Sequence, residues 1–113
     1  MEVKRGDIFY ANLTARSGSV QCGQRPVLVI QNNIGNAHSP TTLVVPLTSR
    51  WKKRNLPTHV MLPADPMNGL KCDSVVLTEQ IQTLDISSFT KKLGHVANMS
   101  AIDQALKVSI ALA

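Results

Sequence analysis

The sequence predicts a small, mostly β domain of the α+β class, in which a curled antiparallel sheet or barrel is closed by a C-terminal helix. Five or six short apolar segments, separated by turn-forming residues, indicate the strands. After residue 98 the apolar pattern changes to the period of a helix. The chain has 113 residues, which is enough for one core, so we expect a single domain spanning residues 1–113.

The first two predicted strands differ in character. Residues 8–13 form a short β-type segment, and residues 14–24 form a loop without either period. Residues 27–32 are a nearly continuous apolar run, which is typical of a strand buried on both faces. Residues 33–40 consist of turn-forming residues, so we expect a turn there.

The third predicted strand, residues 41–48, contains Pro46. Proline has no N–H for the ladder, so this strand is expected at an edge or with a bulge at its end. A second loop follows at residues 49–55, and further strands are predicted at 57–62 and 72–81.

The C-terminal part combines an ambiguous segment with a clear helix. Residues 83–96 fit one helical turn and one short strand. From Asn98 onward a wide apolar helical face appears, with Asn98 or Ser100 as its cap. The face is formed by Met99, Ile102, Ala105, Leu106, Val108, Ile110 and Leu112.

The net charge of +5 is concentrated in one half of the chain. Residues 8–64 contain six Lys or Arg and no acid, whereas residues 65–113 contain five acids and four bases. A one-sided positive field attracts a polyanion such as nucleic acid, or an acidic protein segment. A basic surface that serves only solubility is the alternative.

The remaining composition argues against several classes of protein. Cys22 and Cys72 match neither a disulfide framework nor a zinc site. No apolar run approaches the ~18 residues of a membrane span, and the N-terminus lacks an apolar signal core. The sequence contains no cluster of carboxylates of the kind that a metal-dependent nuclease uses. We therefore expect a soluble cytoplasmic protein without membrane association, metal or other cofactor.

Arg25 and Thr48 are the candidate catalytic pair. Arg25 lies where the first loop meets the second strand, and Thr48 ends the third strand. Consecutive strands are usually neighbours, so the two could share a rim, although the opposite strand polarity leaves this open. A guanidinium fork and a hydroxyl together suit the stabilisation of a phosphorane in phosphoryl transfer. A surface ion-pair arginine and an ordinary strand terminus are the alternative interpretation.

The second loop predicts contacts with single-stranded nucleic acid. Arg50, Lys52, Lys53 and Arg54 surround Trp51, so phosphates can pair with the cations while a base stacks on the indole. Trp51 packed into the core is the alternative.

Acidic and imidazole side chains give weaker signals. Glu79 and Gln80 interrupt an apolar run, and a half-buried carboxylate needs a partner, either an arginine or a base edge of a ligand. His38, His59 and His95 fit satisfied structural histidines.

An ordered set of motifs resembles the MazF/PemK-type toxins of bacterial toxin–antitoxin systems. The set runs along most of the chain: Lys4-Arg-Gly-Asp7, Gly23-Gln-Arg-Pro-Val-Leu-Val-Ile-Gln-Asn32, Gly35-Asn36, Ser39-Pro-Thr41, Pro57-Thr-His-Val60, Asp73-Ser-Val75, Glu79-Gln-Ile81 and the apolar terminal helix.

This resemblance implies an SH3-like barrel that forms a homodimer and cleaves single-stranded RNA, often messenger RNA, without metal. The 2′-hydroxyl would attack the adjacent phosphate and leave a 2′,3′-cyclic phosphate and a 5′-hydroxyl. Arg25 and Thr48 match the family's catalytic pair, and a cognate antitoxin with an acidic flexible tail is the expected partner. The predicted RNA-binding residues are Ser19, Gln21, Ser49, Arg50, Trp51, Lys52, Lys53, Glu79 and Gln80.

Three positions depart from the family pattern. This chain has Val20 and Cys22 where relatives commonly have Glu and Gly, and Gln82 where they have a basic residue. These changes put inference of the cleaved sequence in doubt. A gyrase-poisoning toxin on the same barrel and a non-catalytic nucleic-acid-binding barrel are the rival hypotheses. The first relies on a tryptophan near the C-terminus, which this chain lacks.

Overall fold

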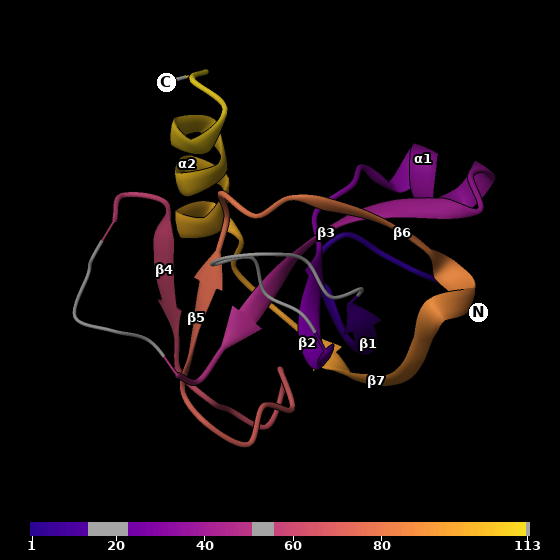
Figure 1. Cartoon of the computed structure of the whole chain (residues 1–113), viewed down its shortest axis with the longest axis horizontal. Coiled ribbons are helices and arrows are strands. Elements are labelled where there is room, and N and C mark those ends of the chain that lie inside the picture. The colour runs from indigo at the N-terminus through magenta and orange to yellow at the C-terminus, as the bar shows by residue number, and fades with distance from the viewer. Residues whose placement is uncertain (14–22, 51–55, 113) are drawn as a thin grey trace.

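The computed structural model describes residues 1–13, 23–50 and 56–112 (Figure 1). In these three segments, seven strands are accompanied by two α-helices and one 3-10 turn. The elements are β1 (Asp7–Leu13), β2 (Gly23–Val29), α1 (Asn33–His38), β3 (Thr41–Thr48), β4 (His59–Leu62), β5 (Ser74–Leu77), β6 (Gln82–Asp85), the 3-10 turn (Ile86–Ser88), β7 (Phe89–His95) and α2 (Ser100–Ser109).

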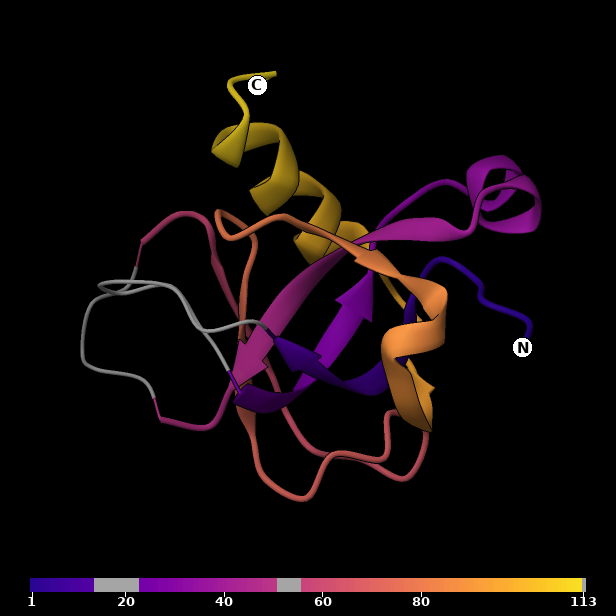
Figure 2. The same ribbon diagram turned by 45° about the vertical axis from the view of Figure 1, so that its right-hand side comes forward.

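The strands form one antiparallel, curled sheet, as predicted. Their order is β4-β5-β3-β2-β1-β7, and β6 pairs with β3 outside this path. The sheet bends around its own interior while α2 leans against one end of it (Figure 2). This arrangement confirms the mostly β, barrel-like fold class.

Pro46 does not mark an edge strand, so that alternative of the prediction is wrong. β3 lies inside the sheet, with β2 on one side. On the other side its Thr41–Val44 part pairs with β6, and its Leu47–Thr48 part pairs with β5. Pro46 falls where β3 changes partner, and a missing ladder N–H is tolerated between two partners.

Two apolar clusters lie on the two faces of the sheet. Val27, Leu28 and Val29 of β2 are all fully buried, which confirms a strand buried on both faces. Neighbouring residues alternate between the clusters, because successive side chains of a strand point to opposite faces. One cluster contains Phe9, Val27, Val29, Val44 and Phe89, and the other contains Ile8, Leu28, Val45, Leu47, Val76 and Ile102.

Helix α2 covers the second cluster through its buried residue Ile102, and Met99 and Leu106 pack against the same cluster. The predicted helix is confirmed, but Met99 takes the N-cap position without a side-chain bond. Asn98 contributes beside it, because its Oδ1 accepts from the Ser100 N–H at 3.0 Å. Neither helix described is long and apolar enough to cross a membrane.

The structure corrects the prediction for one short segment and defines another that the sequence left ambiguous. Residues 33–38 form α1 rather than a turn, because the Asn32 side chain accepts from the Gly35 N–H at 2.8 Å and caps the first turn. The ambiguous segment 83–96 contains the predicted helical turn and strand, preceded by most of β6.

Candidate active site

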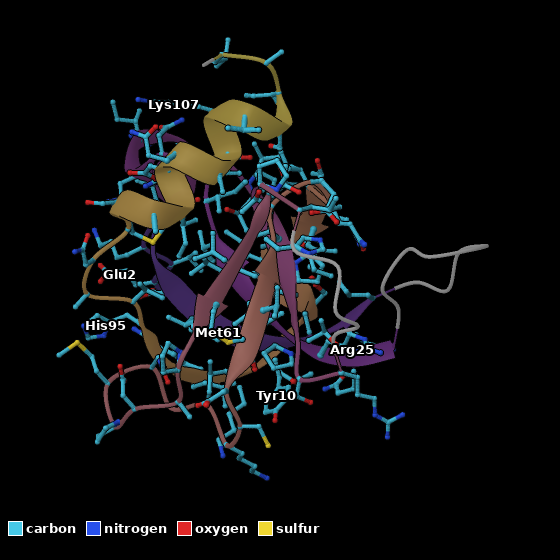
Figure 3. All side chains as sticks on the ribbon, turned by 90° about the vertical axis from the view of Figure 1, so that its left-hand side faces the viewer. Glu2, Tyr10, Arg25, Met61, His95 and Lys107 are labelled. Atoms are coloured by element: carbon cyan, nitrogen blue, oxygen red, sulfur yellow. The ribbon has the colours of Figure 1, made fainter. Side chains whose placement is uncertain are left out.

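Arg25 and Thr48 are brought to the same rim of the sheet by the pairing of β2 with β3. The register pairs Val27 with Pro46 and Val29 with Val44. Continuing this antiparallel register beyond Val27 places Arg25 opposite Thr48. The start of β2 therefore lies beside the end of β3, so opposite strand polarity unites the candidate pair. Figure 3 shows Arg25 toward the same end of the molecule as Tyr10 of β1.

A pocket of about 270 Å³ opens at this rim. Its polar wall combines Arg25 and Lys71 with an amide and two serine hydroxyls, and no acidic side chain lines it among the described residues. Since two cations share the wall, the pocket suits an anion. The lining residues are Tyr10, Gln24, Arg25, Pro26, Leu47, Ser49, Leu70, Lys71, Cys72, Ser74 and Leu93.

Thr48 lies beside this pocket but is directed to the backbone of the following loop. Its side chain is buried. The Thr48 Oγ1 accepts from the Arg50 N–H at 3.1 Å and donates to the Arg50 carbonyl at 3.2 Å. Its neighbours Leu47 and Ser49 line the pocket. The Thr48 hydroxyl therefore fixes the start of the second loop, and Ser49 brings a hydroxyl to the pocket.

The opposite wall comes from the loop between β4 and β5, residues 63–73, which sequence reasoning did not select. Asn68 organises this loop from within, since its side chain is 1% exposed. Its Oδ1 accepts from the N–H groups of Asp65 and Leu70, and its Nδ2 donates to the Pro63 carbonyl at 2.9 Å. The loop thus has a core of hydrogen bonds of its own.

Two glycines fix this loop against β7. A Cβ at Gly69 would overlap the Leu93 carbonyl, and a Cβ at Gly94 would overlap the Met67 carbonyl. Gly69 also has a φ of +68°, a conformation that side-chain-bearing residues rarely adopt. The His95 N–H donates to the Met67 carbonyl at 3.0 Å. Backbone therefore contacts backbone, and Leu70, Lys71 and Cys72 reach the pocket from a fixed support.

Lys71 lies outside the acid-free residues 8–64, in the half of the chain where five acids outnumber four bases, so charge composition does not single it out. The available signal was a glycine followed by an apolar residue and a lysine in a turn-rich segment.

Glu79 and Gln80 follow the opposite end of β5. Ser74 at the start of β5 lines the pocket, whereas Glu79 lies in the turn after Leu77. The expected partner of Glu79 was an arginine or a ligand. Instead, its carboxylate accepts from Thr58 Oγ1 at 3.0 Å and lies 3.3 Å from His59 Nε2. His59 is thereby a satisfied histidine, as its sequence context predicted.

Several predicted residues lie outside the described part of the chain. They are Ser19, Gln21, Trp51, Lys52 and Lys53, together with the departures Val20 and Cys22. Gln82 is described: it begins β6, and its buried Nε2 has no hydrogen-bond partner within the described segments. In those same segments, no three His, Cys, Asp or Glu side chains cluster closely enough to hold a metal ion.

Comparisons with known proteins identify the family and the fold. The family described as PemK-like, MazF-like toxin of type II toxin-antitoxin system matches residues 4–110. Endoribonuclease EndoA of Bacillus subtilis is 48% identical over 99% of this chain and 97% of its own length.

Solved structures show the same fold. MazF from Deinococcus radiodurans has a TM-score of 0.78 at 26% identity, with 98% of each chain covered. A mycobacterial endoribonuclease in complex with its cognate antitoxin has a TM-score of 0.74 at 26% identity, covering 97% of this chain and 94% of that chain. This chain therefore belongs to the PemK-like, MazF-like toxins of type II toxin–antitoxin systems, the endoribonuclease family that its sequence resembles.

Proposed function

We propose that this single-domain chain is the toxin of a type II toxin–antitoxin pair and cleaves single-stranded RNA, including messenger RNA in the cytoplasm, at the pocket beside Arg25. The observation that supports the proposal most is the β2–β3 register, which sets Arg25 and Thr48 at one rim where the pocket is lined by two cations and no described acid. The 48% identity to a protein named an endoribonuclease supports the reaction class.

In the proposed reaction the ribose 2′-hydroxyl attacks the adjacent phosphorus. The O2′–P bond forms as the P–O5′ bond breaks. The 2′-hydroxyl gives its proton to solvent water and the 5′-oxygen takes one from water, so protons balance over the reaction. The products are a 2′,3′-cyclic phosphate and a 5′-hydroxyl. Because the nucleophile belongs to the substrate, the protein has to position it and stabilise charge, and no metal is needed to generate it.

Arg25 performs the electrostatic part of this proposal. A guanidinium presents several donors in one plane, so it neutralises the pentacoordinate phosphorane and donates hydrogen bonds to its oxygens, including the departing 5′-oxygen. Thr48 contributes by holding the backbone of Arg50, which sets the position of Ser49 in the pocket wall. Ser49, Arg50, Glu79 and Gln80 stay proposed RNA contacts, as do the predicted residues outside the described segments.

We also propose a homodimer and an antitoxin partner with an acidic flexible segment. The six cations without acids in residues 8–64 favour an acidic chain electrostatically. A similar mycobacterial endoribonuclease was solved with its cognate antitoxin. Light scattering of the purified chain tests the dimer. For the antitoxin, we expect binding that weakens with salt and that inhibits RNA cleavage.

The central experiment maps the products of cleavage. Purified protein is incubated with EDTA and either a long single-stranded RNA, the same sequence as DNA, or the RNA carrying 2′-O-methyl groups. We expect discrete cuts in the unmodified RNA alone, with 5′-hydroxyl and cyclic-phosphate ends. The cut positions also reveal the recognised sequence.

Other outcomes would contradict this proposal. Cuts in DNA or in the methylated RNA would exclude attack by the 2′-hydroxyl. Binding of RNA without any product would favour the non-catalytic barrel.

A further inference from the structure

The pocket at the Arg25 rim contains a second cation that the proposed catalytic pair does not use. Lys71 lines it from the β4–β5 loop, whereas Arg25 lines it from β2. The two positive charges therefore come from separate walls of one small pocket. The pocket volume of about 270 Å³ is slightly smaller than the ~300 Å³ of the smallest pockets that bind a whole drug-sized molecule. A space of this size suits a phosphate with part of its nucleotide.

The lining has the composition of an anion site rather than of a general basic surface. Arg25 and Lys71 are joined by Ser49 and Gln24, whose side chains carry hydrogen-bond donors. Ser74 also lines the pocket, but its hydroxyl donates to the Cys72 carbonyl at 3.0 Å. The rest of the wall is apolar or aromatic, with Tyr10 as its aromatic residue. Donors over an apolar floor match a phosphate attached to a sugar and a base.

Lys71 is held in place through its backbone. The loop that carries it is organised around the buried Asn68 and fixed to β7 at Gly69 and Gly94. Its side chain is exposed, so the ammonium remains accessible to a ligand from solution. A flexible side chain on a fixed backbone position differs from a cation on a mobile loop, because the entropy lost on binding is limited to the side chain.

The geometry points to Lys71 as a second phosphate-binding residue for single-stranded RNA: it binds the phosphate next to the one that Arg25 contacts. This inference rests on the proposed function, and it adds a substrate contact outside the catalytic pair. RNA is favoured over an acidic peptide because the same pocket contains Arg25 and because phosphate offers more acceptor oxygens to two cations and the Ser49 hydroxyl than one carboxylate does.

The test uses the full chain and a 2′-O-methyl RNA that contains the mapped site but cannot be cut. Binding is measured over a range of salt concentrations for wild type, Lys71→Gln, Lys71→Arg and a control, Lys107→Gln. Lys107 is an exposed lysine in the last turn of α2, so its variant removes the same charge away from the pocket.

We expect Lys71→Gln to weaken binding about tenfold, in line with the loss of one charged hydrogen bond. The slope of log affinity against log salt falls by about 1, because one phosphate contact is lost. We expect Lys71→Arg to have the wild-type affinity and salt slope, and Lys107→Gln to leave both quantities unchanged. With cleavable RNA, Lys71→Gln raises KM about tenfold and leaves kcat within about twofold, as expected for uniform binding.

Cys72 gives an independent readout in wild-type protein. It is an exposed free thiol next to Lys71 and also lines the pocket. We expect the 2′-O-methyl RNA to slow its alkylation by iodoacetamide several-fold, as followed on the peptide that contains Cys72.

The outcomes separate this inference from the proposed function. Equal binding by Lys71→Gln and Lys107→Gln, or Cys72 alkylation unaffected by RNA, overturns the inference even if wild type cuts RNA. An acidic peptide whose binding depends on Lys71 while RNA binding does not would assign the pocket to a protein segment and overturn it too. If wild type cuts nothing, the proposed function fails, while the same binding series on the long 2′-O-methyl RNA still decides on Lys71.

Discussion

The two ends of strand β5 differ in how their charges are neutralised. At the Ser74 end, Arg25 and Lys71 share a pocket that no described acid lines. At the Leu77 end, the carboxylate of Glu79 lies within reach of Thr58 and His59 (strand β5 is labelled in Figure 1). The carboxylate at the second end therefore has protein partners, which RNA would have to share in order to contact Glu79. The first end accumulates one sign of charge, which favours an anionic ligand.

This difference separates two uses of the same chemistry. Both ends present charged side chains beside short apolar strands, and the sequence analysis placed Arg25 in the catalytic pair and Glu79 among the RNA contacts. The two ends differ in which charged groups meet there, and this depends on which loops come together at each end. Substitutions that remove a charge or a contact at one end can therefore be compared with a matched substitution elsewhere.

The largest effect is expected for Arg25→Ala. Loss of the guanidinium that stabilises the phosphorane should lower the rate of RNA cleavage by about 10²–10³-fold. Single-turnover cleavage of the mapped RNA site measures it, and a thermal melt of each variant shows that the fold is retained. A cleavage rate close to wild type in pure Arg25→Ala would remove Arg25 from the catalytic role.

Gly94→Ala tests the fixed support of the pocket's second wall. The added methyl group would overlap the Met67 carbonyl, which is backbone and cannot turn away. We expect a loss of about 3 kcal/mol in the free energy of unfolding, measured by urea denaturation.

Gly35→Ala in α1 is the matched control for this substitution. There the three atoms nearest to the added methyl group belong to the side chain of Gln31, whose amide can shift within its hydrogen bonds to Asn36 and Thr41, and alanine favours a helix. Its stability is therefore expected within about 1 kcal/mol of wild type. Equal stability of the two variants would show that the β4–β5 loop is not fixed on β7.

Glu79→Gln probes the neutralised end. The amide keeps an acceptor for Thr58 but removes the charge beside His59, and the Glu79 side chain is 32% exposed. We expect a stability loss below about 1 kcal/mol and a KM for RNA within about threefold of wild type. Cleavage kinetics on the mapped site provide the measurement. A changed preference at one nucleotide position would instead show that RNA extends to this end of β5 and contacts Glu79.

The rim of the active site follows from the sequence through local rules. An apolar run after Arg25 and a β-branched run ending at Thr48 predict two neighbouring strands, and antiparallel pairing then joins the start of one to the end of the other. Turn composition misled at residues 33–38, where one asparagine caps a short helix among residues that usually form turns.

The second wall could not be predicted in the same way. Lys71 reaches the pocket because Gly69 and Gly94 allow two distant backbone segments to touch, and neither propensity nor periodicity contains that contact. Pro46 illustrates the same limit, since a proline tolerated at a change of strand partner looks in the sequence like one tolerated at an edge.

The smallest effect concerns Asp85, an acid whose partners lie within its own turn. Its Oδ1 accepts from both the Ser87 hydroxyl, at 2.7 Å, and the Ser87 N–H, at 2.9 Å. These bonds, led by the one from the hydroxyl, hold the pKa of the Asp85 carboxyl below its ordinary value of 3.8. A carboxyl with a lowered folded-state pKa stabilises the fold above its unfolded pKa, and this contribution is lost as pH falls through the folded value. Asp85→Ala should therefore lower the urea midpoint slightly at pH 7, and the difference from wild type should shrink below about pH 4. A difference that stays constant down to pH 3 would mean that the side chain acts there through packing rather than through its charge.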